Sequence, residues 1–311
     1  MAGPDDVPAF TVTYFTRCPL WSEHVDRSSA DRRGLATREV GMVHSVRGFS
    51  GTVRGFSGTV RARVLILACV AALVPLTNVR AADDAKDLLK TMSDFMAKQQ
   101  KFSFSYQSTI EVVTPDFQKL QFVSSGTATV DRPDKLRVTR KGGFADIDVV
   151  FDGATFSVLG KNLNDYAQIE AKGTIDELTE RLADAGVEAP GADLLSANIF
   201  DGLIDGVTDA KHIAGAVVNG VDCEYLAFRK PDVDWEIWIA DGDRPVPLRY
   251  VITSKHVSQA PQYMFELSDF KSGDEVESAD FRFSPGSAKK VDLSALVSID
   301  ELPSQTAEDA Q

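Results

Sequence analysis

A long alternation of apolar and polar residues restricts the fold of this chain more than any other feature. From Phe102 to Val112, Phe102, Phe104, Tyr106, Ser108, Ile110 and Val112 alternate with Ser103, Ser105, Gln107, Thr109 and Glu111. A period of two that is sustained in this way is typical of a β-strand with one dry face and one wet face. The chain must therefore bury one side of a sheet.

Ten more strand-like segments follow and are separated by turn residues. Pro133, Asp152-Gly153 and Asn219-Gly220 supply turns, and the last of these pairs suits a type I′ hairpin. The segments cover roughly residues 118–130, 134–141, 144–151, 154–160, 164–170, 208–218, 221–230, 233–240, 247–255 and 262–271. Eleven strand candidates in one chain predict a mainly β fold with helices, built as an antiparallel barrel or strongly curved sheet.

A helix is expected before the first strand. Between Asp84 and Gln100 the apolar residues recur at helical spacing and form a single stripe. The stripe consists of Leu88, Leu89, Met92, Phe95 and Met96.

A helical insert separates the two groups of strands. Thr174 and Glu177 form a capping box, and Gly186 is expected to end the helix, whose buried stripe is Ile175, Leu178, Leu182 and Ala185. The next segment, Ala192–Ile204, has too many apolar residues for one exposed helix face. It is therefore expected to cover something apolar, such as the mouth of a barrel.

The N-terminal region has the features of an export signal. Arginines precede a 13-residue apolar run, Val64–Leu76, and small residues permit cleavage after Ala81. The run is shorter than the roughly 20 residues of a transmembrane helix. The alternatives are an uncleaved signal anchor and lipidation at Cys69, and the Arg32-Arg33 pair lies too far from the run for a twin-arginine signal.

These features divide the chain into three parts. Residues 1–81 form an N-terminal extension and signal peptide, residues 82–302 a periplasmic domain, and residues 303–311 a flexible C-terminal tail. A second methionine, Met42, offers an alternative start that would leave residues 1–41 untranslated. N-terminal sequencing of the precursor distinguishes the two starts.

The charge of the expected mature chain argues against several partners. Of the 46 acidic and 33 basic residues, 6 and 10 lie in residues 1–81, so the remainder has 40 acids against 23 bases. Phosphate backbones and anionic surfaces recruit Lys and Arg, so nucleic acid is not expected as a partner. The apolar run is too short to make this an integral membrane protein.

The sequence offers no recognisable catalytic apparatus, cofactor site or metal site. His212 and His256 lie in strand candidates without ligands at metal spacing, and no phosphate loop or nucleophile elbow occurs. Asp146 and Asp148 alternate with apolar residues and are expected on a solvated strand face. The single cysteine of the mature chain, Cys223, is expected to be buried.

Several short motifs lie next to the predicted turns. They are Val130–Arg137, Val149–Phe156 and Tyr166–Gln168, and their order and spacing resemble those of the LolA and LolB lipoprotein carriers. Ala279–Pro285 is similar to the closing strand of the same fold. Trp238–Pro247 resembles an uncharacterised family of predicted periplasmic proteins within that superfamily.

The resemblance implies a half-open barrel of about 11 strands around an apolar cavity, closed by helices that move when acyl chains enter. In LolA the arginine of an Arg-Pro motif ties the barrel to this helical lid, and Arg132 occupies its place. The alternative is that Arg132 only anchors a turn. The residues expected in the lid are Met92, Phe95, Met96, Ile199, Phe200 and Leu203, together with Arg132.

The candidate cavity lining consists of the inward apolar residues of the strands. They are Phe102, Phe104, Tyr106, Leu136, Ile147, Val149, Trp235, Ile237, Tyr263, Phe265 and Leu267. Ordinary core packing is the alternative role for each of them.

Two classes of function fit these features. The first is a non-enzymatic periplasmic carrier for a hydrophobic ligand, which could be a lipid, an acyl chain or a lipoprotein, with an envelope membrane protein as a further partner. The second is a non-enzymatic envelope interaction protein whose barrel core is filled by its own side chains. A hydrolase lacks a nucleophile and base pair here.

Overall fold

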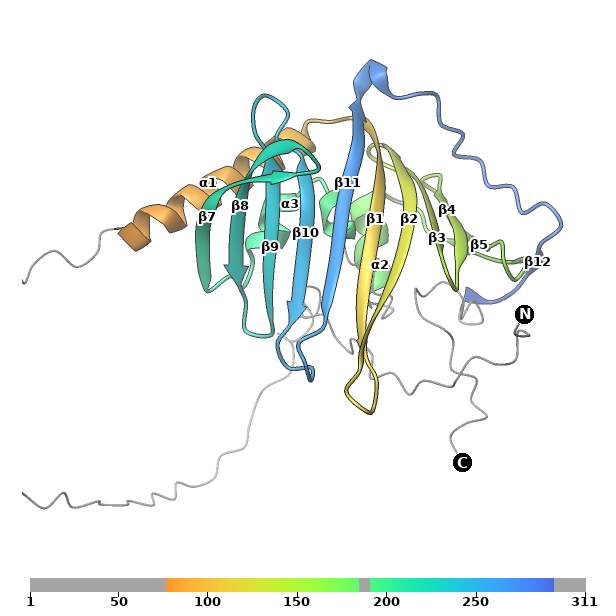
Figure 1. Cartoon of the computed structure of the whole chain (residues 1–311). Helices are drawn as coiled ribbons and strands as arrows, with labels where there is room; N and C mark the ends of the chain where they lie inside the picture. The colour runs from red at the N-terminus through yellow and green to blue at the C-terminus, as the bar shows by residue number, and fades with distance from the viewer. Residues whose placement is uncertain (1–76, 185–190, 294–311) are drawn as a thin grey trace, which may run out of the picture. The chain divides into compact units, whose positions relative to one another are not determined.

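The computed structural model describes residues 77–184 and 191–293 (Figure 1). The predicted signal segment up to residue 76, the alternative start Met42 and the predicted tail 303–311 lie outside the described residues. Within these ranges, no helix is both long and apolar enough to cross a membrane. Cleavage after Ala81, which remains a prediction, would remove the first residues of the first helix.

Twelve strands form one sheet in the order β12-β6-β5-β4-β3-β2-β1-β11-β10-β9-β8-β7. The strands are β1 (Lys101–Val113), β2 (Lys119–Asp131), β3 (Lys135–Gly142), β4 (Asp146–Phe151), β5 (Thr155–Gly160), β6 (Asp165–Glu170), β7 (Asp209–Val218), β8 (Val221–Arg229), β9 (Val233–Ala240), β10 (Pro247–Ser254), β11 (Gln262–Ser272) and β12 (Lys289–Lys290). Neighbours are antiparallel, except that β12 joins β6 in parallel. β7 and β12 do not pair with each other, so the sheet stays open and the predicted half-open antiparallel barrel is confirmed.

The C-terminal region is where the predicted strands were wrong. Ala279–Pro285, expected to be the closing strand, contains no strand, and the short β12 was not predicted. Instead the Asp280 carbonyl accepts a hydrogen bond from Arg137 Nη1 at 2.8 Å, and the Phe283 ring lies 5.4 Å from that of Tyr166. The segment is therefore held by side chains of β3 and β6 and not by strand pairing.

Asp148 also departs from its prediction. It is buried, and its carboxylate accepts hydrogen bonds from Arg137 Nε and Nη2 at 3.2 and 2.7 Å. The same arginine binds the Asp280 carbonyl, so the C-terminal segment reaches this side of the sheet. The alternation predicts that this strand face is exposed to solvent, but the C-terminal segment around Asp280 partly covers it.

Four of the helices in the described residues pack on one face of the sheet, called here the inner face, and a fifth, the 3₁₀ helix η2 (Gly273–Glu275), follows β11. The four are α1 (Thr77–Ala97), α2 (Ile175–Asp184), α3 (Ile199–Ile204) and the short 3₁₀ helix η1 (Ala192–Leu195). Buried residues from all four belong to one core cluster with the inner-face side chains. The predicted segment Ala192–Ile204 is therefore two short helices.

The capping box of α2 is confirmed. The Thr174 backbone N–H donates to Glu177 Oε2 at 2.7 Å, and the Glu177 N–H donates to Thr174 Oγ1 at 3.2 Å. Ile175 and Leu178 are buried, and Leu182 packs against the same core. Ala185 and Gly186 lie outside the described residues.

At Gly126 of β2, the neighbouring strands β1 and β3 leave no room for a side chain. A Cβ there would lie 1.8 Å from the Thr139 carbonyl oxygen and 3.0 Å from the Tyr106 ring. Because strand backbone cannot move aside cheaply, Gly126→Ala should lower the melting temperature by roughly 3–10 °C in thermal unfolding followed by circular dichroism. Gly143→Ala, where a Cβ meets nothing within 4 Å, is the control and should change it by at most about 2 °C. Equal shifts would contradict the register of β2 and β3.

Candidate functional site: the apolar interior and its helical lid

The inner face brings together most of the predicted cavity residues. Phe102, Phe104, Leu136, Trp235, Ile237, Tyr263, Phe265 and Leu267 are buried in the core cluster, and Tyr106 and Val149 pack against it half-buried. Ile147 is buried but does not belong to this cluster. Its cross-strand partners are Arg140 and Gly160, which offer it no large apolar neighbour.

Aromatic rings form the floor of this interior. The Phe265 ring lies 5.3 Å from that of Tyr106 and 6.1 Å from that of Phe104, which in turn lies 6.3 Å from Phe102. Further along the sheet, the Trp235 ring stacks on Phe228 at 4.0 Å. Rings have few rotatable bonds, so this floor is stiff.

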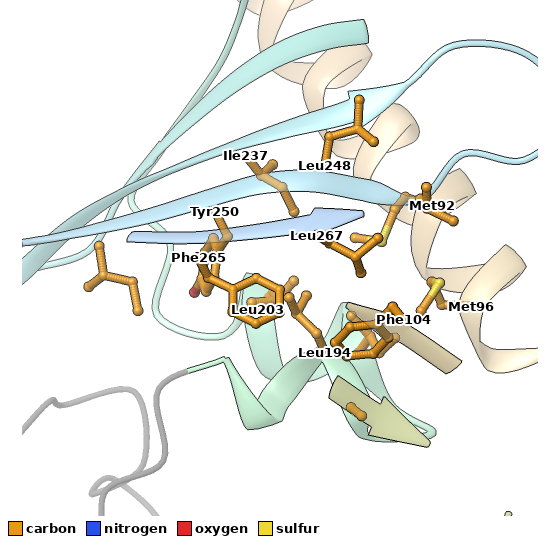
Figure 2. Close-up of a cluster of buried hydrophobic side chains, with 14 of the residues drawn as sticks. Met92, Met96, Phe104, Leu194, Leu203, Ile237, Leu248, Tyr250, Phe265 and Leu267 are labelled. Atoms are coloured by element: carbon orange, nitrogen blue, oxygen red, sulfur yellow. The ribbon is translucent and has the colours of Figure 1, made fainter. Parts of the chain in front are cut away.

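The helices fill the space above this floor with flexible side chains. Met92, Met96, Ile199 and Leu203 are buried in the cluster, and Phe95 and Phe200 pack against it. Figure 2 shows Met92, Met96 and Leu203 beside the rings and leucines of the sheet. Methionine adapts readily to the shape of its neighbours. The predicted lid residues thus lie over the predicted cavity residues, in direct contact with them.

Arg132 joins two helical ends to the sheet. Its Nη1 donates to the carbonyl oxygens of Met96 and Gln99 at 2.8 and 3.0 Å, and its Nη2 donates to those of Leu195 and Ser196 at 2.9 and 2.8 Å. Met96 and Leu195 lie in the last turns of α1 and η1, and Gln99 and Ser196 just after them, where carbonyls lack intrahelical partners. The Met96 carbonyl also accepts a hydrogen bond from the Gln99 N–H at 3.1 Å. One guanidinium therefore satisfies both helix ends.

The turn between β2 and β3 holds this guanidinium in place. The Arg132 N–H donates to the Gln100 carbonyl at 2.8 Å, and the Gln100 side-chain amide donates to the Arg132 carbonyl. The Arg132 guanidinium also lies 5.0 Å from the centre of the Phe102 ring. Burial lowers the pKa of Arg132 while the Asp176 carboxylate raises it, and an arginine with so high an intrinsic pKa stays charged.

Two further contacts of the lid were missed by sequence reasoning. Asp176 Oδ1 in α2 accepts a hydrogen bond from the Ala197 N–H at 3.0 Å, which links α2 to the segment between η1 and α3. Asp193 in η1 accepts a hydrogen bond from the Tyr250 hydroxyl of β10 at 3.3 Å. In the sequence, Asp193 is one of two acids in the largely apolar segment Ala192–Ile204, and nothing marks Asp176 for its contact.

The environment of Asp193 changes its acidity. Burial raises the pKa of this carboxyl to about 6, although hydrogen bonds from Leu194 N–H and Tyr250 and the charge of Lys230 oppose the shift. A carboxyl with this pKa is mostly ionised at pH 7 and takes up its proton as the pH falls through about 6. The contact between η1 and the sheet is therefore expected to depend on pH.

The histidines take part in pairs and not in a larger cluster. His212 Nε2 lies 2.5 Å from Glu224 Oε2, and His256 Nε2 lies 3.2 Å from Asp232 Oδ1. Within residues 77–184 and 191–293, no three His, Cys, Asp or Glu side chains are arranged to hold a metal ion. Cys223 is buried, as expected.

A hollow of about 580 Å³ on the described part of the chain is not the predicted cavity. Tyr106 and Leu267 reach it, but most of its lining is polar and lies on the outer face. These lining residues include Ser105, Gln107, Ser125, Thr127, Glu266 and Ser268.

The buried carboxyl gives a prediction for stability against pH. Because its pKa rises from 3.8 to about 6 on folding, the folded chain binds the proton more tightly than the unfolded chain. The group therefore weakens the fold above about pH 6, and this loss fades as the pH falls toward 4. Asp193→Asn should be more stable than the wild type near pH 7 but not near pH 4, as measured by urea unfolding.

The matched control is Asp201→Asn, which alters an exposed carboxylate of α3. The difference in the free energy of unfolding between this variant and the wild type should be the same at pH 4 and pH 7. If the difference for Asp193→Asn were also the same at both pH values, the Asp193 carboxyl would have the same pKa in the folded and unfolded chain, and the prediction would be wrong.

Comparisons with solved structures find only distant similarity. An uncharacterised protein from Thermus thermophilus has 12% identity and a TM-score of 0.41, with 67% of this chain and 99% of that chain covered. The Mycobacterium tuberculosis lipoprotein LppX has 14% identity and a TM-score of 0.38, with 64% of this chain and 99% of that chain covered. A LolA superfamily protein from Nitrosomonas europaea has 12% identity and a TM-score of 0.32, with 61% of this chain and 94% of that chain covered. None of these similarities identifies a ligand or a partner.

The family comparison is more direct. No curated protein matches the sequence. A family described as "Predicted periplasmic protein (DUF2092)" matches residues 85–294, which begin in α1 and extend past β12. This match contains the whole sheet, the helical lid and Arg132. The chain therefore belongs to the DUF2092 family of predicted periplasmic proteins.

Proposed function

We propose that the mature chain is a non-enzymatic periplasmic carrier that binds a hydrophobic ligand between the inner face of the sheet and the helices. The class of ligand is a lipid, an acyl chain or the acylated end of a lipoprotein. The observation that carries the proposal is the position of Arg132, whose four hydrogen bonds hold two helix ends over an apolar interior. Membership of a family described as periplasmic agrees with this site of action.

The energies are compatible with a lid that a ligand displaces. Burial contributes about 0.8 kcal/mol per CH₂, so an acyl chain of about fifteen carbons offers on the order of 10 kcal/mol before ordering costs. Hydrogen bonds to a charged group contribute about 1.5–3 kcal/mol each. The ligand would replace the contacts of Met92, Met96 and Leu203 with the floor and would have to break the bonds of Arg132. The two sums are of similar size, which suits reversible binding.

A second candidate rests on the packing of the same interior. The lid side chains already fill the space above the rings, as expected of an envelope interaction protein with a filled core. Mass spectrometry of small molecules copurified with the protein from a native periplasmic extract separates the two. Stoichiometric lipid supports the carrier, and its absence from a protein that also fails to bind an acyl probe supports the filled core.

Arg132→Lys tests the lid directly. Lysine keeps the charge, but its single ammonium lacks the fork that reaches both pairs of carbonyls. Because the closed lid competes with the ligand, a larger open population should raise the affinity for a fluorescent fatty acid several-fold. The melting temperature should decrease, by between a few degrees and about 10 °C.

The control is Arg137→Lys in the neighbouring strand. Arg137 has a similar number of polar contacts, but they go to Asp148 and to the Asp280 carbonyl, away from the lid. This variant should lose stability without a change in probe affinity. If both variants bound the probe as the wild type does, Arg132 would be a structural turn residue and the gating role would be wrong.

A further inference from the structure

Exposed apolar side chains gather at the end of the sheet opposite Arg132. In an antiparallel meander, alternate turns lie at the same end, so the turns after β1, β3 and β5 share one end and the turn with Arg132 lies at the other. Phe117, Phe144 and Leu163 occupy these three turns and are 65%, 37% and 49% exposed. We call these three residues the apolar tips. In Figure 1 the β1–β2 turn lies at the lower end of the sheet.

Contacts with nearby residues hold the tips in place. The side-chain amide of Asn162, next to Leu163, donates to the Phe144 carbonyl at 2.9 Å. The Phe144 ring lies 5.5 Å from the Phe122 ring of β2. At the end of the β1–β2 turn, the side-chain amide of Gln259 donates to the Phe117 carbonyl. These contacts keep the exposed apolar residues on ordered turns at one end of the sheet.

Apolar contacts connect this end to the interior. Val112 and Phe122 form a second, smaller apolar cluster on the β1–β2 hairpin. Ile110 packs against both this cluster and the main core that contains Phe104 and Phe265. Buried side chains along β1 therefore connect this end with the floor beneath the lid, and the Ser108 and Ser124 hydroxyls, 2.9 Å apart, are the polar pair among them.

The charges beside the tips differ from those of the chain as a whole. Lys141 and Lys161 flank the turns that carry Phe144 and Leu163, and both lie 3.6 Å from the one carboxylate of Asp146. Asp165 follows the turn of Leu163, so two lysines and two aspartates leave these two turns neutral, while the whole chain has a net charge of −13. Aromatic and aliphatic side chains on a neutral end of an acidic chain suit the interface of a bilayer.

We propose that the apolar tips dock the protein on a lipid bilayer, so that an acyl chain passes between the bilayer and the interior along β1. This inference rests on the proposed carrier function for its cargo, while the docking itself does not need it. A protein partner would be expected to require a wider apolar surface than three separated tips. A bilayer accepts side chains at separate points, because each inserts independently.

The first experiment measures docking. Wild type and the triple variant Phe117→Ser, Phe144→Ser, Leu163→Ser are floated with vesicles of phosphatidylethanolamine containing some phosphatidylglycerol. The control is the pair Val217→Ser, Val221→Ser, which removes two side chains of 65% and 43% exposure beside the β7–β8 turn. That turn lies at the end of the sheet with Arg132. The tip variant should bind vesicles at least several-fold less than the wild type, and the control should bind as the wild type does.

The second experiment measures transfer of a fluorescent fatty acid from loaded protein to the same vesicles. If transfer requires collision with a vesicle, its rate should rise in proportion to vesicle concentration for the wild type and the control. For the tip variant the slope of this rise should be several-fold smaller. Probe affinity without vesicles should be equal in all three, which also shows that each is folded. Vesicle-independent transfer, or equal flotation of the tip variant and wild type, would overturn the inference.

The two experiments separate this inference from the proposed function. If the wild type floats through its tips but binds no probe, docking stands and the carrier function fails. If it binds the probe but does not float, the carrier function stands and docking is wrong, which leaves a protein as the partner for the tips.

Discussion

Four backbone carbonyls from two helix ends converge on the guanidinium of Arg132, and the position of the lid depends on this convergence. A helix end that is placed over apolar surface loses the water that would otherwise satisfy its last carbonyls. Arginine is the one side chain with enough donors in a fixed plane to satisfy four acceptors at once. Without it, α1 and η1 would each bring unsatisfied carbonyls to the edge of the core.

The packing beneath this polar contact divides into a stiff part and an adaptable part. The floor consists of rings that belong to neighbouring strands, such as Tyr106 and Phe265, and their positions are set by strand register. The cover consists of Met92, Met96, aliphatic side chains and the partly buried rings of Phe95 and Phe200 on the helices. Asp193 adds a polar bond to Tyr250 of the sheet, in a place where burial makes its charge unfavourable. The proposed displacement of the cover would leave the floor in its shape.

The strands and the capping box of α2 could be predicted because each depends on residues close together in the sequence. The role of Arg132 was expected only from a resemblance to a known family, because its partners Met96 and Leu195 lie far from it in the sequence. Period-two alternation fixes a strand whichever neighbour it pairs with, and Thr174 and Glu177 meet within one helical turn. Asp148 was misjudged because its burial depends on a C-terminal segment more than a hundred residues away. The contacts of Asp176 and Asp193 were missed for the same reason, since no local pattern reveals which carboxylate meets a distant N–H or hydroxyl.

The two ends of the sheet have opposite physical requirements, and the sequence meets them with different residues. At the end with Arg132, polar donors satisfy helix carbonyls, so the apolar interior is closed there by hydrogen bonds that depend on direction. At the other end, Phe117, Phe144 and Leu163 are exposed where no helix covers them. Apolar contact does not depend on direction, so such residues suit a fluid surface better than a shaped one. An acidic chain whose exposed apolar turns are neutral would meet a bilayer at this end and keep its lid in water.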